Sequence, residues 1–164
     1  LLSLLFALQV HAQTCNDSIT PATPDSRFSD NGDGTATDKT TNLIWMRCAL
    51  GQTWDGSTCT GSAASYTWQQ ALQAAADTSF AGNSAWQLPN IKQLNSIVEV
   101  SCYDPAINLN LFPATPSSRF WTASPIAYAN YYDDAWNVNF YYGNANYINK
   151  YNHYYMRLVR SDSN

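Results

Sequence analysis

Four cysteines constrain this chain more than any other feature: Cys15, Cys48, Cys59 and Cys102. An even number of cysteines in an exported chain indicates disulfides, and four cysteines allow three pairings. Cys48 and Cys59 bracket the short loop ALGQTWDGST, so a bridge between them is the easiest to close, which leaves Cys15 to pair with Cys102. Each bridge is expected to contribute roughly 3 kcal/mol through the unfolded state. No pair has zinc-finger spacing, so metal binding is the weaker interpretation and we assign no metal ligand.

The first ten residues, LLSLLFALQV, indicate that the chain is exported. This apolar block has the length of a signal-peptide core and is too short to span a bilayer. It runs into Val10-His11-Ala12, a small-x-small cleavage pattern. We therefore predict a signal peptide over residues 1–12, truncated at its start, with a buried N-terminal strand as the weaker alternative. The mature protein is expected to be secreted, periplasmic or on the cell surface, without direct insertion into a membrane.

The rest of the chain has the length of one domain. Residues 13–26, QTCNDSITPATPDS, are polar, include two prolines and are predicted to form a linker. Residues 27–164 are predicted to form the domain itself. The net charge is −4, and the eight Lys and Arg residues are scattered along the sequence. Without a basic patch, binding of nucleic acid or strong electrostatic capture of sulfated polysaccharides is not expected.

The local patterns predict an α+β domain. The turn residues DNGDG at 30–34 predict a hairpin; an EF-hand calcium loop is disfavoured because Thr40 stands where that loop needs a bidentate Glu. Residues 65–78 have helical periodicity, and Thr67 with Gln70 forms a capping box. Asn90 and Gln93 mark the start of a second helix in the same way. The stretches FWTAS, AWNVNFYY and YMRLVR then follow as strand candidates.

The chain lacks the groupings that catalysis uses. After residue 12 it has one histidine, His153, and one glutamate, Glu99, which we place on the solvated face of the second helix. Asp133 and Asp134 are adjacent, so in a strand they point to opposite faces and do not form an acid–base pair. Nucleophile-elbow, HExxH, GxGxxG and Walker motifs are absent. We therefore expect a protein that is not an enzyme and needs no cofactor.

The order of six motifs is distinctive: RFSDNGDGTATDKTTNLIW, TWQQAL, WQLPNIKQL, FWTAS, AWNVNF and YMRLVR. Together they cover residues 27–160 and resemble the C-terminal domain family of the Legionella collagen-like adhesin. That family is similar to C-type lectin-like folds and to formylglycine-generating enzymes. The resemblance implies a C-type lectin-like fold, with two helices packed on small twisted antiparallel sheets.

Three departures narrow what the resemblance implies. Gln87 replaces the arginine of the family's usual Trp-Arg-Leu-Pro, and Gln93 stands where an acidic residue is common, so the two could compensate as a neutral pair. No cysteine follows Cys102, so the catalytic cysteines of formylglycine-generating enzymes are missing. The segment at 88–90, LPN, lacks the first ligand of a calcium-lectin triplet, so calcium-mediated sugar binding is not supported.

Residues 128–155, YANYYDDAWNVNFYYGNANYINKYNHYY, contain nine of the eleven tyrosines and seven asparagines. Within them Trp136, Val138 and Phe140 alternate as a core strand would. A low-complexity, prion-like tract explains the composition but not these anchors. A glycan site is a second interpretation, because tyrosine faces stack on sugars while Asn and Asp bind hydroxyls.

The genetic code offers a third interpretation of this run. Asn, Tyr, His and Asp codons differ only in their first base, so randomised adenines in a template of Asn codons yield this composition. The run therefore resembles the variable region of a diversity-generating retroelement target protein, a class that commonly uses C-type lectin-like folds. Its composition is also that of an antibody paratope.

We therefore predict an exported protein that binds a protein or glycan ligand on another cell, a phage or a host. A fixed-specificity glycan-binding adhesin is the alternative. Asn137 and Asn139 are uncertain because they lie inside the anchoring strand, and Tyr154 and Tyr155 are either contacts or core. The predicted ligand-binding residues are Tyr128, Asn130, Tyr131, Tyr132, Asp133, Asp134, Tyr141, Tyr142, Asn144, Asn146, Tyr147, Asn149, Tyr151, Asn152 and His153.

Overall fold

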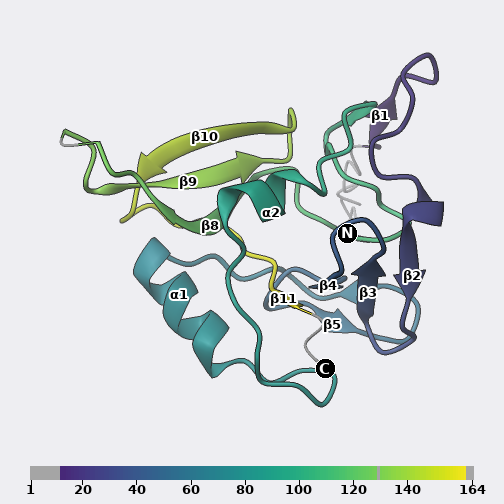
Figure 1. The fold of residues 1–164 in the computed structure, drawn as a ribbon, viewed down its shortest axis with the longest axis horizontal. Helices are drawn as coiled ribbons and strands as arrows, with labels where there is room; N and C mark the ends of the chain where they lie inside the picture. Colours follow the sequence, from purple (N-terminus) through teal and green to yellow (C-terminus); the bar gives the residue numbers. More distant parts are fainter. Residues whose placement is uncertain (1–11, 129, 162–164) are drawn as a thin grey trace, which may run out of the picture.

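The structure, a computed structural model, describes residues 12–128 and 130–161. Nearly all of the expected signal peptide lies outside these residues. The predicted α+β class is confirmed: two α-helices accompany small antiparallel sheets, and two disulfides are present (Figure 1). Within the described ranges, no helix is both long and apolar enough to cross a bilayer.

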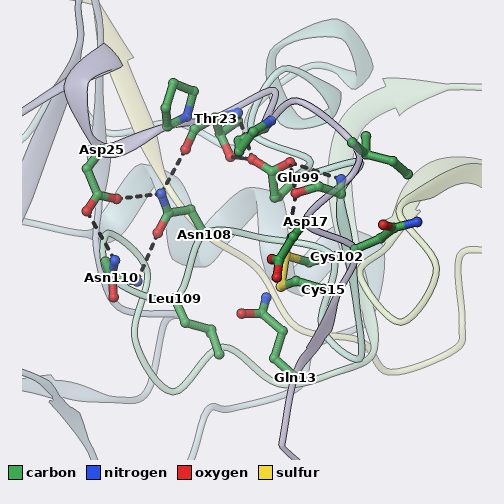
Figure 2. A pocket seen from close by; sticks show the side chains of 15 residues that line it. Gln13, Cys15, Asp17, Thr23, Asp25, Glu99, Cys102, Asn108, Leu109 and Asn110 are labelled. Carbon is green, nitrogen blue, oxygen red and sulfur yellow. Dashed lines mark hydrogen bonds between the residues drawn. A yellow bond between two sulfur atoms is a disulfide. The ribbon is translucent and has the colours of Figure 1, made fainter.

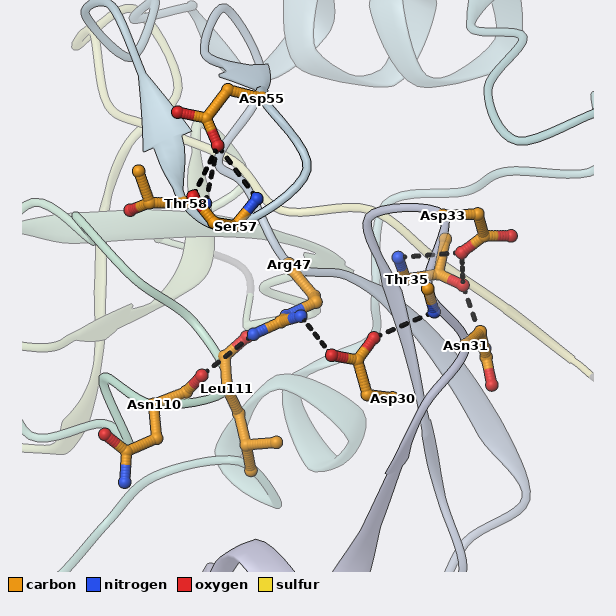
Figure 3. A network of polar contacts seen from close by, with 11 residues as sticks. Asp30, Asn31, Asp33, Thr35, Arg47, Asp55, Ser57, Thr58, Asn110 and Leu111 are labelled. Carbon is orange, nitrogen blue, oxygen red and sulfur yellow. Dashed lines mark hydrogen bonds and ion pairs between the residues drawn. The ribbon is translucent and has the colours of Figure 1, made fainter.

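One sheet has four antiparallel strands in the order β11-β4-β3-β2. The DNGDG turn connects β2 to β3, as predicted, and the C-terminal strand β11 pairs with β4 (Figure 1). Arg47 binds this sheet to a distant loop: its guanidinium donates to the Asp30 carboxylate and to the carbonyls of Asn110 and Leu111 (Figure 3). The strands are β2 (Phe28–Asp30), β3 (Thr35–Asp38), β4 (Leu43–Met46) and β11 (Val159–Ser161).

A second sheet has three antiparallel strands in the order β10-β9-β8. They are β8 (Arg119–Pro125), β9 (Asp134–Asn139) and β10 (Asn144–Asn149). On the far side of β8, Tyr155 forms a bridge with Phe120, whereas β10 is an edge strand of this sheet. The Tyr/Asn run therefore supplies two of the three strands, and β10 is a strand that the sequence patterns did not predict.

Both helices begin at the predicted capping boxes. Thr67 and Gln70 cap α1 (Trp68–Asp77), and Asn90 and Gln93 cap α2 (Ile91–Asn95). The proposed neutral pair between Gln87 and Gln93 is wrong. Gln87 is exposed, and the Gln93 side chain accepts from the Asn90 N–H at 2.8 Å to complete its own cap.

The predicted disulfides are confirmed. Cys15–Cys102 joins the short strands β1 (Thr14–Cys15) and β7 (Cys102–Tyr103), and Cys48–Cys59 closes the loop that contains β5 (Thr53–Trp54) and β6 (Cys59–Thr60). A single 3₁₀ turn, Asp25–Arg27, precedes β2. The N-terminal segment, expected to be a linker, is thus fastened to the domain.

Two apolar cores hold the sheets and helices together. The first includes Leu94 and Ile97 from the α2 region with Val138 and Phe140 from the three-stranded sheet. The second lies beside α1 and includes Ala71, Trp121, Met156 and Leu158.

Arg157 is fully buried. In the sequence it lies between Met156 and Leu158 of the second core, and its side chain reaches Phe112 of the first core. Its guanidinium donates to the carbonyls of Met46 and Arg47 and to Thr115, and lies 4.8 Å from the centroid of the Phe112 ring. Burial lowers the pKa of this guanidinium to about 9.

Candidate ligand-binding site

Fourteen of the fifteen predicted contact residues lie in two groups toward the two opposite ends of the β9–β10 hairpin, whose strands Figure 1 shows side by side; the fifteenth, Asn146, pairs with Asn137 in the middle of the hairpin. One group lies where the loop before β9 meets the end of β10, and we call it the loop-end surface. The other lies at the β9–β10 turn, and we call it the turn-end surface; it consists of Tyr141, Tyr142 and Asn144. The loop-end surface consists of Tyr128, Asn130, Tyr131, Tyr132, Asp133, Asp134, Tyr147, Asn149, Tyr151, Asn152 and His153.

A row of aromatic rings crosses the loop-end surface. Tyr128 and Tyr131 have ring centroids 6.1 Å apart, Tyr131 and Tyr147 are 5.4 Å apart, and Tyr147 and Trp136 are 5.7 Å apart. Tyr147 stands opposite Trp136 in the β9–β10 register, so these two rings share one face of the hairpin. The row joins residues from a loop and from two strands, which gives an exposed aromatic surface with a defined shape.

Polar contacts hold the loop against the hairpin. The Lys150 N–H donates to the Asp133 carbonyl at 2.8 Å, and its ammonium donates to the Tyr132 carbonyl. Asn149 caps the following turn by accepting from the Tyr151 N–H at 3.0 Å. The loop-end surface is therefore anchored from β10 as well as from β9.

A hollow of about 210 Å³ lies at this end of the sheet. Thr67, Trp68 and Gln69, at the start of α1, form one side, and Asp133, Lys150 and Tyr151 form the other. The Lys150 ammonium lies 4.9 Å from the centroid of the Trp68 ring. The hollow therefore combines aromatic faces with one acidic and one basic side chain.

The turn-end surface is smaller and includes residues from another part of the chain. The rings of Tyr141 and Tyr142 have centroids 4.4 Å apart and meet edge to face. The Asp104 N–H donates to the Tyr141 carbonyl at 2.9 Å, which places β7 and the residue after it beside the turn. The Asp104 carboxylate, then Tyr142 and Tyr103, raise the pKa of the Tyr141 phenol.

Between the two ends, the hairpin is mostly scaffold. Val138 and Phe140 are buried as predicted, but Trp136 is only half-buried, because it lies outside both apolar cores and packs on Tyr147. Asn137 is fully buried, and neither polar atom of its side chain has a hydrogen-bond partner among the described residues. Asn137 therefore does not reach a ligand.

Most of the predicted contact residues are exposed. Six of the nine large hydrophobic side chains that are exposed in the described residues belong to the run: Tyr128, Tyr131, Tyr132, Tyr142, Tyr147 and Tyr151. Asn130, Asn144, Asn152 and His153 are also exposed, whereas Asp133, Asp134, Tyr141, Asn146 and Asn149 are half-buried. Tyr154 and Tyr155 pack against the two cores, which makes them scaffold residues.

Four residues beside the two surfaces were not predicted as contacts. Trp68 and Lys150 line the loop-end hollow, and Tyr103 and Asp104 border the turn-end surface. Lys150 lies within the Tyr/Asn run, but it was not chosen as a contact because the run was identified by its Tyr, Asn, Asp and His residues. The other three are distant in sequence, and only the tertiary fold brings them to it.

Another pocket, of about 440 Å³, lies under the N-terminal segment and away from the predicted contacts (Figure 2). Glu99 forms part of its wall and is 3% exposed, so its assignment to a solvated helix face is wrong. Its carboxylate accepts from Thr23 and Ser101 (Figure 2), and also from the Ala22 N–H. Burial acts to raise the pKa of Glu99, but these hydrogen bonds outweigh it and lower the pKa to about 2. These contacts fasten the N-terminal segment rather than leave groups aimed at a ligand.

No curated protein and no solved structure matches the chain, so the C-type lectin-like topology stays a prediction. The family model of the Lcl C-terminal domain matches residues 34–160. This range includes both apolar cores, except for Phe28, and nearly all of the scaffold that supports the two candidate surfaces. The chain belongs to the Lcl C-terminal domain family.

Proposed function

We propose that this chain is a non-catalytic, exported, adhesin-like protein that recognises a ligand on another cell, a phage or a host. The loop-end surface is the main contact. The observation that carries this proposal is the row of exposed rings from Tyr128 through Tyr131 to Tyr147, which packs on the half-buried Trp136. The family name, with its adhesin-like character, and the two disulfides support export and a binding role.

The physical properties of the row suit recognition. A tyrosine offers a large amphipathic area and immobilises only two side-chain torsions on binding, while Asn side chains add adaptable hydrogen bonds. A few central aromatic residues usually provide most of the affinity of an interface, and surrounding polar residues exclude water. Tyr131 and Tyr147 occupy that central place in the row, and the exposed Tyr132 and Tyr151 belong to the same loop-end surface.

The scaffold allows these residues to vary. No residue of the loop-end surface belongs to the buried part of either apolar core, and the domain is braced by two disulfides. Substitutions at such positions usually change stability by less than about 0.5 kcal/mol. This separation supports the finer proposal that the chain is a diversity-generating retroelement target protein with a C-type lectin-like fold.

A binding experiment tests the function itself. Labelled protein is screened against bacterial cells, phage particles and a glycan array, and the variant Tyr131→Ala with Tyr147→Ala is compared on every surface that binds. We expect at least about a tenfold loss of affinity, because both rings lie at the centre of the row. The free energy of unfolding should fall by about 1 kcal/mol or less, since the two side chains are 42% and 44% exposed.

Ile19→Ala is the matched control, because Ile19 is also 42% exposed but lies on the N-terminal segment. It should leave binding unchanged. Undiminished binding of the double variant would exclude the loop-end surface as the contact, and a large loss of stability would make both tyrosines structural.

A fixed-specificity glycan-binding adhesin remains the second candidate, favoured by the hollow between Trp68 and Tyr151. Aromatic faces beside Asp133 and Lys150 provide both stacking and hydrogen bonding for a sugar. Binding confined to defined sugars on the glycan array, and abolished by Tyr151→Ala, would establish this alternative.

Diversification is tested on DNA. Several kilobases around the gene are sequenced in independent isolates. We expect a near-copy of codons 120 to 160, differing only where the copy has adenine, close to a reverse transcriptase gene. Isolates that agree throughout the run and lack such a copy would instead show a site of fixed specificity.

A further inference from the structure

Asp104, which borders the turn-end surface, has no ion-pair partner among the described residues. The two ion pairs among the described residues, Arg27–Asp38 and Arg47–Asp30, do not include Asp104. The Asp104 side chain is half-buried, and no hydrogen-bond donor of the described residues contacts its carboxylate. A carboxylate that no group of the chain neutralises is available to pair with a cation from outside the chain.

Three tyrosines lie next to Asp104, either in the sequence or across the β9–β10 turn. Tyr141 and Tyr142 lie with ring centroids 4.4 Å apart, and Tyr103 immediately precedes Asp104. The Asp104 N–H donates to the Tyr141 carbonyl at 2.9 Å, which makes the two residues direct neighbours, and the Asp104 carboxylate together with Tyr103 raises the pKa of the Tyr141 phenol. Tyrosine faces attract cations, and guanidinium groups in particular stack on them.

The backbone holds these groups in place. The Cys15–Cys102 disulfide fixes β7, and Tyr103 pairs with Thr14 in the β1–β7 register. Hydrogen bonds from Asp104 to Tyr141 and from Ala106 to Phe140, at 2.9 and 2.5 Å, then attach the following residues to the end of β9. The backbone that carries the carboxylate and the rings is therefore fixed before binding, so only side chains need to be ordered.

We propose that Asp104, Tyr103, Tyr141 and Tyr142 form a site for a lysine or arginine side chain of a protein ligand. The cation pairs with the Asp104 carboxylate and lies against the tyrosine faces. The site is open, since Tyr142 is 70% and Tyr103 is 47% exposed, which suits a side chain presented by a partner surface more than an enclosed small molecule. The proposal rests on the proposed binding function but assigns to it a second contact, in which Tyr103 and Asp104 lie outside the Tyr/Asn run, and a defined ligand charge.

The test uses small probes and the intact protein. Nα-acetylarginine amide is titrated into the protein and followed by the NMR resonances of Tyr103, Asp104, Tyr141 and Tyr142. Weak binding is expected, with a dissociation constant on the order of 10 mM, because exposed cation–π and ion-pair contacts are individually small. The neutral isostere Nα-acetylcitrulline amide should cause no comparable shifts.

Two variants and a matched control sharpen the result. Asp104→Asn and Tyr142→Ala should each weaken arginine-amide binding about fivefold or more. Tyr132→Ala should change it less than about twofold, because Tyr132 is equally exposed, at 69% against 70%, but lies on the loop-end surface. Equal binding of the citrulline probe, or unchanged affinity of Asp104→Asn, would overturn the proposal. Tighter binding of tetramethylammonium than of arginine amide would overturn it in favour of a site for free quaternary ammonium compounds.

The outcome is separable from that of the main proposal. The variant Tyr131→Ala with Tyr147→Ala should keep the arginine-amide shifts, because its changes lie at the other end of the hairpin. Loss of cell or glycan binding in that variant, without any effect of Asp104→Asn on the arginine probe, would support the loop-end function and refute the cation site. Retained cell or glycan binding in that variant, together with weaker arginine-amide binding by Asp104→Asn, would refute the loop-end function and support the cation site.

Discussion

Gly143 shows how a single residue fixes the position of the binding hairpin. It lies in the β9–β10 turn with a φ of 76°, a left-handed conformation that other residues adopt at a cost. A Cβ atom there would lie 2.8 Å from Val98 Cγ1 and 3.0 Å from the Cβ atom of Ala106. Both neighbours are buried in the first apolar core, so neither can move freely.

We therefore predict that Gly143→Ala is more destabilising than its backbone conformation alone requires. Gly32→Ala is the control, because Gly32 has a φ of 77° in another hairpin turn but no atom within 4 Å of the added Cβ. Gly32→Ala should cost about 1 kcal/mol, and Gly143→Ala roughly 2 kcal/mol more through overpacking. Chemical denaturation of both variants measures this difference. Equal losses would mean that the turn moves away from Val98 without penalty.

At the scale of elements, the sequence predicted what depends on local signals. Both helix starts follow from capping boxes, and the first hairpin follows from the turn residues between β2 and β3. Strand β10 was missed because its sequence, NANYIN, is half asparagine and its alternation of polar and apolar residues breaks at Tyr147 and Ile148. Its extended form comes from pairing with β9, a tertiary contact that periodicity does not report.

The sequence predicted which segment contains the candidate site but not how its residues are arranged in space. Composition identified the run, and most of its tyrosines are exposed. Its division into two surfaces depends on the length of the β9–β10 pairing, and the contribution of Trp68, Tyr103 and Asp104 depends on how distant segments pack. Glu99 was placed wrongly for a related reason: α2 ends at Asn95, so Glu99 lies beyond the helix face on which it was predicted.

At the scale of the whole molecule, Glu99 connects the N-terminal segment to the domain. Its carboxylate accepts hydrogen bonds from Ala22 and Thr23 on one side and from Ser101 on the other. The Cys15–Cys102 disulfide closes the same junction covalently, across a sequence separation of 87 residues. The segment is therefore part of the folded unit that carries both candidate surfaces.

The lowered pKa of Glu99 predicts how stability changes in acid. Its folded pKa of about 2 lies below the ordinary value of 4.5, so the stabilisation is fully present above about pH 5 and is lost as the pH falls toward 2. A shift of this size corresponds to about 3 kcal/mol. Glu99→Gln should lower the free energy of unfolding at pH 7 by about that amount and should flatten its decrease below pH 5.

Asp77→Asn removes one negative charge from an exposed position at the end of α1 and should leave the acid profile nearly unchanged. Denaturation of the three proteins from pH 2 to pH 7 makes the comparison. A Glu99→Gln profile parallel to that of the parent protein would show that another carboxylate governs acid stability and that the junction at Glu99 is held by the disulfide alone.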